Sequence, residues 1–135
     1  MLLFIDSDVL LDIILIRQPH NRYAMRLLSL IDSNQYEYCT SVHTLLNVHY
    51  IASKEYGKNA SKEAIKLLLE KLIIIQDDRK IFADALYSEL PDLEDAVQYF
   101  AAKSAKADFI ITRNVKDYKN SIIPVLTAEQ FLNTL

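Results

Sequence analysis

Aspartate side chains recur at three places where a strand or helix boundary is expected. They are Asp6 and Asp8 after the apolar run at 2–5, Asp92 and Asp95 at the start of a helical repeat, and Asp117 after the apolar run at 109–111. The carboxyl ends of parallel strands line the ligand crevice of an open α/β sheet. We therefore expect these carboxylates to converge, where they repel one another unless a divalent cation neutralises them. A single aspartate at such a boundary is also a common helix cap, so the hypothesis depends on all three places together.

The residue types available as ligands indicate which cation this would be. Carboxylate oxygens suit Mg²⁺ or Mn²⁺, and the histidine and thiolate ligands of a zinc site are missing. His20, His43 and His49 are scattered, so we expect surface or packing roles for them, and Cys39 is expected to be a buried small hydrophobe. Because a lone cysteine cannot form an internal disulfide, the sequence favours the reducing cytoplasm.

Short apolar runs alternate with helical repeats, and these elements must position the acids. We expect strands at 2–5, 36–40, 73–75, 109–111 and 122–126, and helices at 9–14, 21–31, 42–56, 60–71, 78–89, 93 to about 101, and 127–135. This alternation predicts an α/β fold with a mainly parallel central sheet and helices on both faces. The run at 2–5 is expected at the centre of the sheet, and Pro124 places the last run at an edge because proline cannot donate within a ladder.

Length and composition indicate one globular domain covering residues 1–135. An apolar fraction of 51% and a charged fraction of 24% are typical of such a domain. The longest apolar run, 9–16, is interrupted by Asp12 and is too short to span a membrane, and Met1 leads into an expected strand without the basic region of a signal peptide. The net charge of −3 lacks the strongly basic signature of many nucleic-acid binders, although a local basic rim can surround an acidic metal site.

The three acidic segments together resemble a known family. They read Phe-Ile-Asp-Ser-Asp-Val-Leu-Leu-Asp at 4–12, Asp-Leu-Glu-Asp-Ala at 92–96, and Ile-Ile-Thr-Arg-Asn-Val-Lys-Asp-Tyr at 110–118. In this order they resemble PIN-domain ribonucleases of the kind found as VapC toxins in bacterial toxin–antitoxin pairs. The helices between them also fit, so the resemblance covers nearly the whole chain.

The resemblance implies a role for particular residues. Asp6, Asp95 and Asp117 would be catalytic and bind the metal, with Asp92 as a further ligand one turn before Asp95. The supporting positions would be Asp8, Asn47, Thr112 and Asn114. Two of these depart from the family pattern, because Asn47 stands where a glutamate is usual and Asn114 where an aspartate is frequent. Asp8 stands where asparagine is common, which can return one acid to the site.

The chemistry implied by the resemblance is Mg²⁺- or Mn²⁺-dependent hydrolysis of RNA phosphodiester bonds, without a covalent intermediate on the protein. Arg113 and Lys116 lie beside the acids and could contact the RNA backbone, or they could be solvated loop charges. The resemblance also implies a homodimer that an antitoxin protein neutralises. An apolar stripe expected at Val42, Leu45, Leu46, His49 and Tyr50, together with Tyr23, Leu27 and Leu30, could accept a helix of such a partner or belong to the core.

Two other functions are compatible with the acidic residues. One is a PIN-like interaction module with a weakened site, for which Asn47 and Asn114 are the support. The other is a phosphatase of the haloacid-dehalogenase kind, in which Asp6 would be the nucleophile and Asp8 the general acid/base. The residues after this pair, Val9 and Leu10, do not match that phosphatase motif, and no convincing lysine motif follows.

Overall fold

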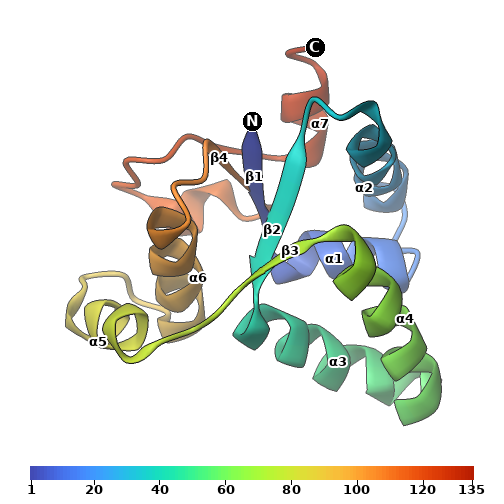
Figure 1. Ribbon diagram of the computed structural model, residues 1–135, viewed down its shortest axis with the longest axis horizontal. Coiled ribbons are helices and arrows are strands. Elements are labelled where there is room, and N and C mark those ends of the chain that lie inside the picture. The colour runs from blue at the N-terminus through green and yellow to red at the C-terminus, as the bar shows by residue number, and fades with distance from the viewer.

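The computed structural model describes residues 1–135 and contains one sheet of five parallel strands (Figure 1). The strands are β1 (Leu2–Ile5), β2 (Glu37–Ser41), β3 (Ile73–Ile75), β4 (Phe109–Ile111) and β5 (Val125–Leu126). The helices are α1 (Ser7–Ile14), α2 (His20–Ser29), α3 (Val42–Tyr56), α4 (Lys58–Lys71), α5 (Arg79–Tyr87), α6 (Leu93–Ser104) and α7 (Ala128–Leu132), with 3₁₀ turns η1 (Leu30–Ser33) and η2 (Val115–Tyr118). The strand order is β3-β2-β1-β4-β5, so β1 is central and β5 is an edge strand, which confirms both predictions.

Helices cover both faces of the sheet, because side chains of each strand alternate between two hydrophobic cores. Leu3 and Ile5 of β1 pack into one core with residues of α1, α2, α3, α4 and α7. Phe4, between them, packs into the other core with residues of α5 and α6. Since both faces are buried, the strands other than β2, which reads Glu-Tyr-Cys-Thr-Ser, are continuous apolar runs rather than alternating ones. Figure 1 shows α5 and α6 on one side of the sheet and α1 to α4 on the other.

Local signals in the sequence fix several helix ends. Gly57 has a φ of +84°, a backbone angle that residues with a side chain rarely adopt, and it separates α3 from α4. Asp78 accepts a hydrogen bond from the Ile81 N–H and begins α5. Thr127 and Gln130 form the reciprocal capping box predicted for the last helix. None of the helices combines the length and hydropathy that a membrane crossing would require.

The apolar stripe predicted for α3 divides between two faces of the helix, one in the core and one exposed. The buried residues of this helix include Leu45, Val48 and Ala52, whereas Val42, Leu46 and Tyr50 are exposed. Residues four apart share a face of a helix, so α3 carries two apolar stripes, and only the first of them faces the core. Leu27 of α2 is also buried in the core, which excludes it from a surface groove.

Cys39 and one histidine have the packing roles predicted for them. Cys39 is fully buried in β2, and burial raises the pKa of its thiol to about 12, so the thiol stays protonated and unreactive. His49 of α3 lies with Nδ1 2.7 Å from Ser61 Oγ of α4 and so links the two helices.

Candidate functional site

Five aspartates lie around the carboxyl ends of β1 and β4, and we call Asp6, Asp8, Asp92, Asp95 and Asp117 the acidic cluster. Asp6 follows β1, caps α1 and is 4% exposed. Its Oδ2 accepts hydrogen bonds from Thr112 Oγ1 at 2.8 Å and from the Tyr118 hydroxyl at 2.9 Å. Its Oδ1 accepts from the backbone N–H and the hydroxyl of Ser7. The Asp6 carboxylate is therefore held in one orientation by groups from three segments.

Asp8, in the first turn of α1, binds the loop that follows β4. Its Oδ2 accepts hydrogen bonds from the Arg113 N–H at 3.1 Å, from Asn114 Nδ2 at 3.0 Å and from Thr112 Oγ1 at 3.3 Å. Its Oδ1 is buried and has no hydrogen-bond partner. Burial, followed by the charge of Asp6, raises the pKa of Asp8 to about 7. One oxygen of Asp8 thus fixes the loop, and the other is left without a donor.

Asp92 and Asp95 lie at the start of α6, and Asp117 lies in η2. Asp92 caps the helix by accepting a hydrogen bond from the Asp95 N–H at 2.9 Å. The Asp95 side chain accepts no hydrogen bond from the protein; its burial, followed by the charges of Asp6, Asp92 and Asp117, raises its pKa to about 7. The end of β1, the start of α6 and η2 therefore bring their carboxylates close enough to repel one another.

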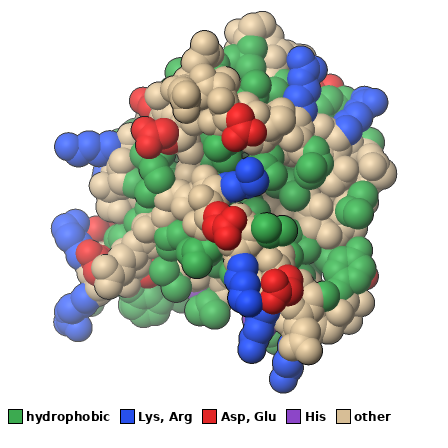
Figure 2. Space-filling model, turned by 45° about the vertical axis from the view of Figure 1, so that its right-hand side comes forward, with side chains coloured by type: hydrophobic (Ala, Val, Ile, Leu, Met, Phe, Trp, Pro, Cys, Tyr) green, Lys and Arg blue, Asp and Glu red, His purple; other side chains and the backbone are tan.

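No cation of the chain forms an ion pair with the acidic cluster, although the charge of Arg113 partly offsets that of Asp8. The protein has three ion pairs, Lys66–Glu63, Lys80–Asp84 and Arg113–Asp12, and none of them involves the acidic cluster. On the face shown in Figure 2, basic and acidic side chains are interspersed among apolar ones, and neither sign forms a single large patch. The charge of the acidic cluster is thus a local feature that a ligand from solution would have to balance.

Two further residues, which the sequence did not identify, organise the site. Gln98, one turn after Asp95 on α6, is buried, and its Oε1 accepts hydrogen bonds from the Ser7 N–H at 3.3 Å and from Thr44 Oγ1 at 3.2 Å. It therefore joins α6 to the start of α1 and to α3. Tyr118 is 3% exposed and anchors Asp6 from η2. The spacing of three from Asp95 could have indicated Gln98, but nothing local indicated that the Tyr118 hydroxyl turns inward.

The remaining candidate residues fall into two groups. Thr112 and Asn114 join the acidic cluster through their hydrogen bonds to Asp6 and Asp8. Asn47 is half-buried on α3 and makes no hydrogen bond to the cluster. The Arg113 side chain turns to Asp12, with 3.0 Å between Nε and Oδ2, in an ion pair that lacks hydrogen-bond alignment at Nε. Lys116 is exposed and forms no ion pair.

The acidic cluster fits a hard divalent cation that is held by few protein ligands. No three His, Cys, Asp or Glu side chains form a ready-made metal cage. Mg²⁺ does not need one, because it usually keeps several water ligands and binds through one or two carboxylates together with substrate phosphates. The free oxygens of Asp95 and Asp117 and the orphaned Oδ1 of Asp8 are the type of ligand that such an ion prefers.

A family model described as PIN domain matches residues 3–116 of the chain. Among curated proteins, Ribonuclease VapC1 of Aquifex aeolicus is 29% identical over 140 residues, an alignment that covers 95% of this chain and 91% of the relative.

Solved structures with the same fold include two toxin–antitoxin complexes. VapBC2 from Rickettsia felis, bound to a DNA fragment from its promoter, matches with a TM-score of 0.71 and 19% identity over 93% of this chain and 97% of the other. VapBC-1 from nontypeable Haemophilus influenzae matches with a TM-score of 0.70 and 16% identity over 96% and 99%. VapC20 of Mycobacterium tuberculosis, described as a toxin that cleaves the sarcin–ricin loop, matches with a TM-score of 0.65 and 14% identity over 80% and 86%.

Proposed function

The chain belongs to the PIN domain family, and from this premise we propose that it is a divalent-metal-dependent endoribonuclease, the toxin of a toxin–antitoxin pair. The observation that carries the proposal is the acidic cluster, in which the charges of Asp6, Asp92 and Asp117 act on Asp95 without a cation of the chain to balance them. Likeness to Ribonuclease VapC1 of Aquifex aeolicus supports the same reaction class. RNA is accordingly the substrate.

Asp6, Asp95 and Asp117 would hold the metal ion, with Asp92 beside them. Asp6 is positioned for this by the hydroxyls of Thr112 and Tyr118. Asp95 and Asp117 have no competing donors, so their oxygens are available to a ligand. Asp8 is a positioning residue, because its Oδ2 is occupied by the loop that presents Thr112 and Asn114. The role of Asp6 follows the family resemblance, the free oxygens support the roles of Asp95 and Asp117, and the orphaned Oδ1 of Asp8 is available as a further ligand.

The ion is proposed to be Mg²⁺ or Mn²⁺, which when bound lowers the pKa of a water molecule and stabilises the charge that develops on the phosphate. Lys116, next to Asp117 and without an ion pair, is the side chain that we propose for contact with an RNA phosphate. Arg113 is less suited to this role than its position in the sequence suggested, because its guanidinium is already paired with Asp12.

A PIN-like interaction module with a weakened site is the second candidate. Asn47 in place of the family's usual glutamate favours it. The two candidates differ in whether the acidic cluster turns over RNA. They agree on the fold and on a protein partner.

Cleavage of a mixed RNA pool by the purified protein tests the proposal. We expect fragments in Mg²⁺ or Mn²⁺, none in EDTA, and none from Asp6→Asn or Asp95→Asn protein. Asp32→Asn, which changes an exposed aspartate in η1 far along the chain from the cluster, is the matched control and should cleave normally. If the unaltered protein does not cleave RNA in either metal and calorimetry detects no Mg²⁺ or Mn²⁺ binding, the interaction module is favoured.

The protein partners that we propose are an antitoxin and a second copy of the chain. Likeness to VapBC complexes supports the antitoxin. Both need apolar surface, and a groove of about 420 Å³ lined by Val42, Leu46, Phe82 and Leu93 provides it between α3, α5 and α6. Light scattering on the lone chain tests the homodimer, which should have twice the 15.6 kDa mass of one chain. A toxin that acts on cellular RNA is expected in the cytoplasm.

A further inference from the structure

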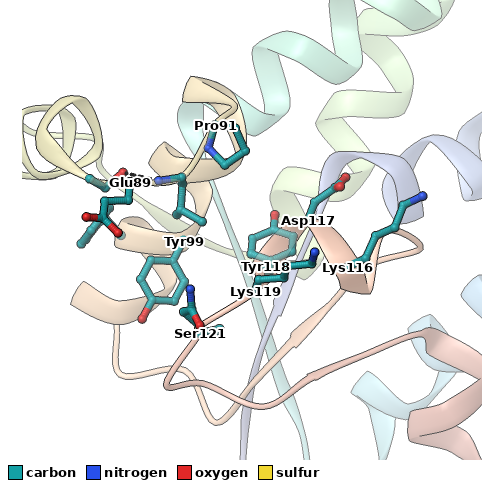
Figure 3. Close-up of a pocket in the computed structure, with 12 residues that line it drawn as sticks. Glu89, Pro91, Tyr99, Lys116, Asp117, Tyr118, Lys119 and Ser121 are labelled. Atoms are coloured by element: carbon teal, nitrogen blue, oxygen red, sulfur yellow. Dashed lines mark hydrogen bonds between the residues drawn. The ribbon is translucent and has the colours of Figure 1, made fainter.

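A cavity of about 580 Å³ lies beside the acidic cluster, between the α5–α6 connection, one face of α6 and the segment from η2 to Ser121. Figure 3 shows Glu89 and Pro91 on one side of it, Lys116 and Asp117 on the other, and the rings of Tyr99 and Tyr118 between them. Its volume falls in the range of about 300–1,000 Å³ that is usual for small-molecule sites. The roles assigned above to the acidic cluster do not use this space.

The cavity and the acidic cluster share a wall. Asp117 belongs to the cluster and also lines the cavity. Tyr118 lines the cavity too, and its hydroxyl donates to Asp6 Oδ2 at 2.9 Å. A polymer with one phosphate at the cluster would therefore have a neighbouring unit beside this cavity.

The interior of the cavity suits a flat, polar ring. Tyr99 and Phe100 of α6 pack edge to face, with ring centroids 5.1 Å apart and planes at 79°. The Tyr99 hydroxyl accepts a hydrogen bond from the Ile122 N–H at 3.3 Å, so its own proton is free to donate. The exposed amide of Asn120 adds both a donor and an acceptor. Unpaired nucleobases are recognised in this way, by stacking on aromatic rings and by hydrogen bonds to their edges.

The charged residues at the rim favour a phosphate-bearing ligand. Lys116 and Lys119 are exposed and form no ion pair, although Glu89 and Asp117 line the same cavity. Lysines left free beside carboxylates can contact an anion from solution, and the backbone of a nucleic acid supplies one at every unit. A purely apolar partner segment would leave both ammonium groups without a counterion.

We propose that this cavity, the base pocket, binds one unpaired nucleobase of a single-stranded RNA, next to the phosphate at the acidic cluster and with Lys119 on the adjoining phosphate. The inference rests on the proposed function and deepens it, because it assigns a base-binding subsite to the cavity beside the acidic cluster. Nucleotide preference at the cleavage site would then be set by Tyr99, Phe100 and Asn120.

The test measures RNA binding in EDTA, where no cleavage is expected. Single-stranded decamers carrying 5-iodouridine are photocrosslinked to the full chain, and the attached peptides are mapped by mass spectrometry. Binding is measured by fluorescence anisotropy for Lys119→Gln and Phe100→Leu, with Lys62→Gln and Tyr56→Leu as matched controls on exposed residues of α4 and α3. Thermal melts establish that the variants fold; Lys119→Gln removes only an exposed charge and keeps the test decisive if Phe100→Leu does not fold.

We expect crosslinks within residues 88–91, 99–100 or 116–121, and binding about tenfold weaker for each of the two pocket variants than for the controls. Crosslinks confined to other segments, or pocket variants that bind like the controls while Asp6-dependent cleavage persists, would overturn the base pocket and leave the proposed function standing. Pocket-dependent binding by a protein that never cleaves RNA would retain the base pocket and overturn the nuclease.

Discussion

Asp6 and Asp8 lie at the start of α1 and Asp12 lies one turn after Asp8, and the charges of the two regions are balanced in different ways. Asp12 has a side chain 2% exposed and is paired with Arg113 of the loop after β4. Asp6 and Asp8, at the start of the same helix, form no ion pair with any residue of the chain. Burial is the first cause of the raised pKa of both Asp8 and Asp12, so burial alone does not distinguish them. The charge of Arg113 favours the ionised form of both, but only Asp12 forms an ion pair with it, and Asp8 is repelled by the charge of Asp6.

This difference separates a structural carboxylate from a ligand-binding one. A buried charge with a fixed partner favours the one arrangement of the chain that keeps the two groups together. A set of carboxylates without such a partner raises the free energy of the folded protein until a cation from solution binds. In the function that we propose, the acidic cluster binds a cation, whereas Asp12 and Arg113 hold the loop that carries Thr112 and Asn114.

The largest effect is expected from Asp6→Asn. It removes the charge of the one cluster carboxylate that is fixed by three segments, and we expect the rate of RNA cleavage in Mg²⁺ to fall about a thousandfold, equivalent to about 4 kcal/mol in the barrier. Initial rates with a fluorogenic RNA measure this, with thermal melting to establish folding. Asp6→Asn protein that cleaves at the rate of the Asp32→Asn control would remove Asp6 from the metal site.

Arg113→Met is expected to act on stability instead. It leaves Asp12 buried without its ion-pair partner, and we expect the free energy of unfolding to fall by about 2 kcal/mol, less than for a fully buried pair because the Arg113 side chain is 32% exposed. His20 and Arg17, whose charges also favour ionised Asp12, moderate the loss. Urea denaturation measures it, and the cleavage rate of the folded variant should stay close to that of the unaltered protein.

Asp12→Asn is the matched control for this pair, because it removes the buried charge and leaves Arg113 able to reach water. The double variant Asp12→Asn with Arg113→Met should be more stable than Arg113→Met alone. If Arg113→Met instead weakens RNA binding while stability is unchanged, Arg113 is an RNA contact. Asp12 would then not differ from Asp6 and Asp8 in having a structural ion-pair partner.

A smaller effect is expected from Tyr118→Phe, which removes one of the donors to Asp6 Oδ2 and keeps the ring. A hydrogen bond to a buried carboxylate contributes about 1.5–3 kcal/mol, and because Thr112 still donates to the same oxygen we expect a loss near the lower value. Cleavage should fall about tenfold through a less fixed Asp6. Tyr56→Phe, on an exposed residue, should change neither quantity.

The fold could be predicted from the sequence because local and global signals agree. The apolar runs at 2–5, 73–75 and 109–111 became strands with those bounds, and Gly57 and Thr127 end and begin helices where expected. Which residues of the α3 stripe are buried could not be predicted, because Val42 and Leu46 are of the same apolar residue types as the core residues. Whether an apolar stripe is buried depends on which elements the fold places over it, which no spacing within one helix reveals.

The convergence of the acids could be anticipated from strand ends, but the hydrogen bonds that orient them could not. Arg113 illustrates the limit: its position beside the acids suggested a substrate contact, yet its long side chain reaches Asp12, 101 positions earlier in the sequence. Gln98 and Tyr118 are likewise recognisable only once α6 and η2 lie against β1. The residue types predicted carboxylate ligands, whereas tertiary packing decides which carboxylate oxygens accept hydrogen bonds from the protein.

Asp95→Asn gives the smallest change in stability that we expect, and its sign is opposite to that of Arg113→Met. In metal-free solution the Asp95 carboxylate is repelled by Asp6, Asp92 and Asp117, and burial together with these charges raises its pKa from 3.8 to about 7. The folded state therefore holds the Asp95 proton more tightly than the unfolded chain does. Stability from this group is fully present below about pH 4 and is lost as the pH rises through 7.

Neutral asparagine removes that loss, so at pH 8 in EDTA we expect Asp95→Asn to raise the free energy of unfolding by about 1 kcal/mol, after allowance for the solvent that screens a half-buried group. This corresponds to a melting temperature about 3–4 °C higher, and the difference should vanish at pH 4. In saturating Mg²⁺ the order should reverse, because only the carboxylate gains from binding the ion. An Asp95→Asn protein that is less stable in EDTA at pH 8 would mean that the chain itself balances this charge, and the acidic cluster would then be structural in the same sense as Asp12.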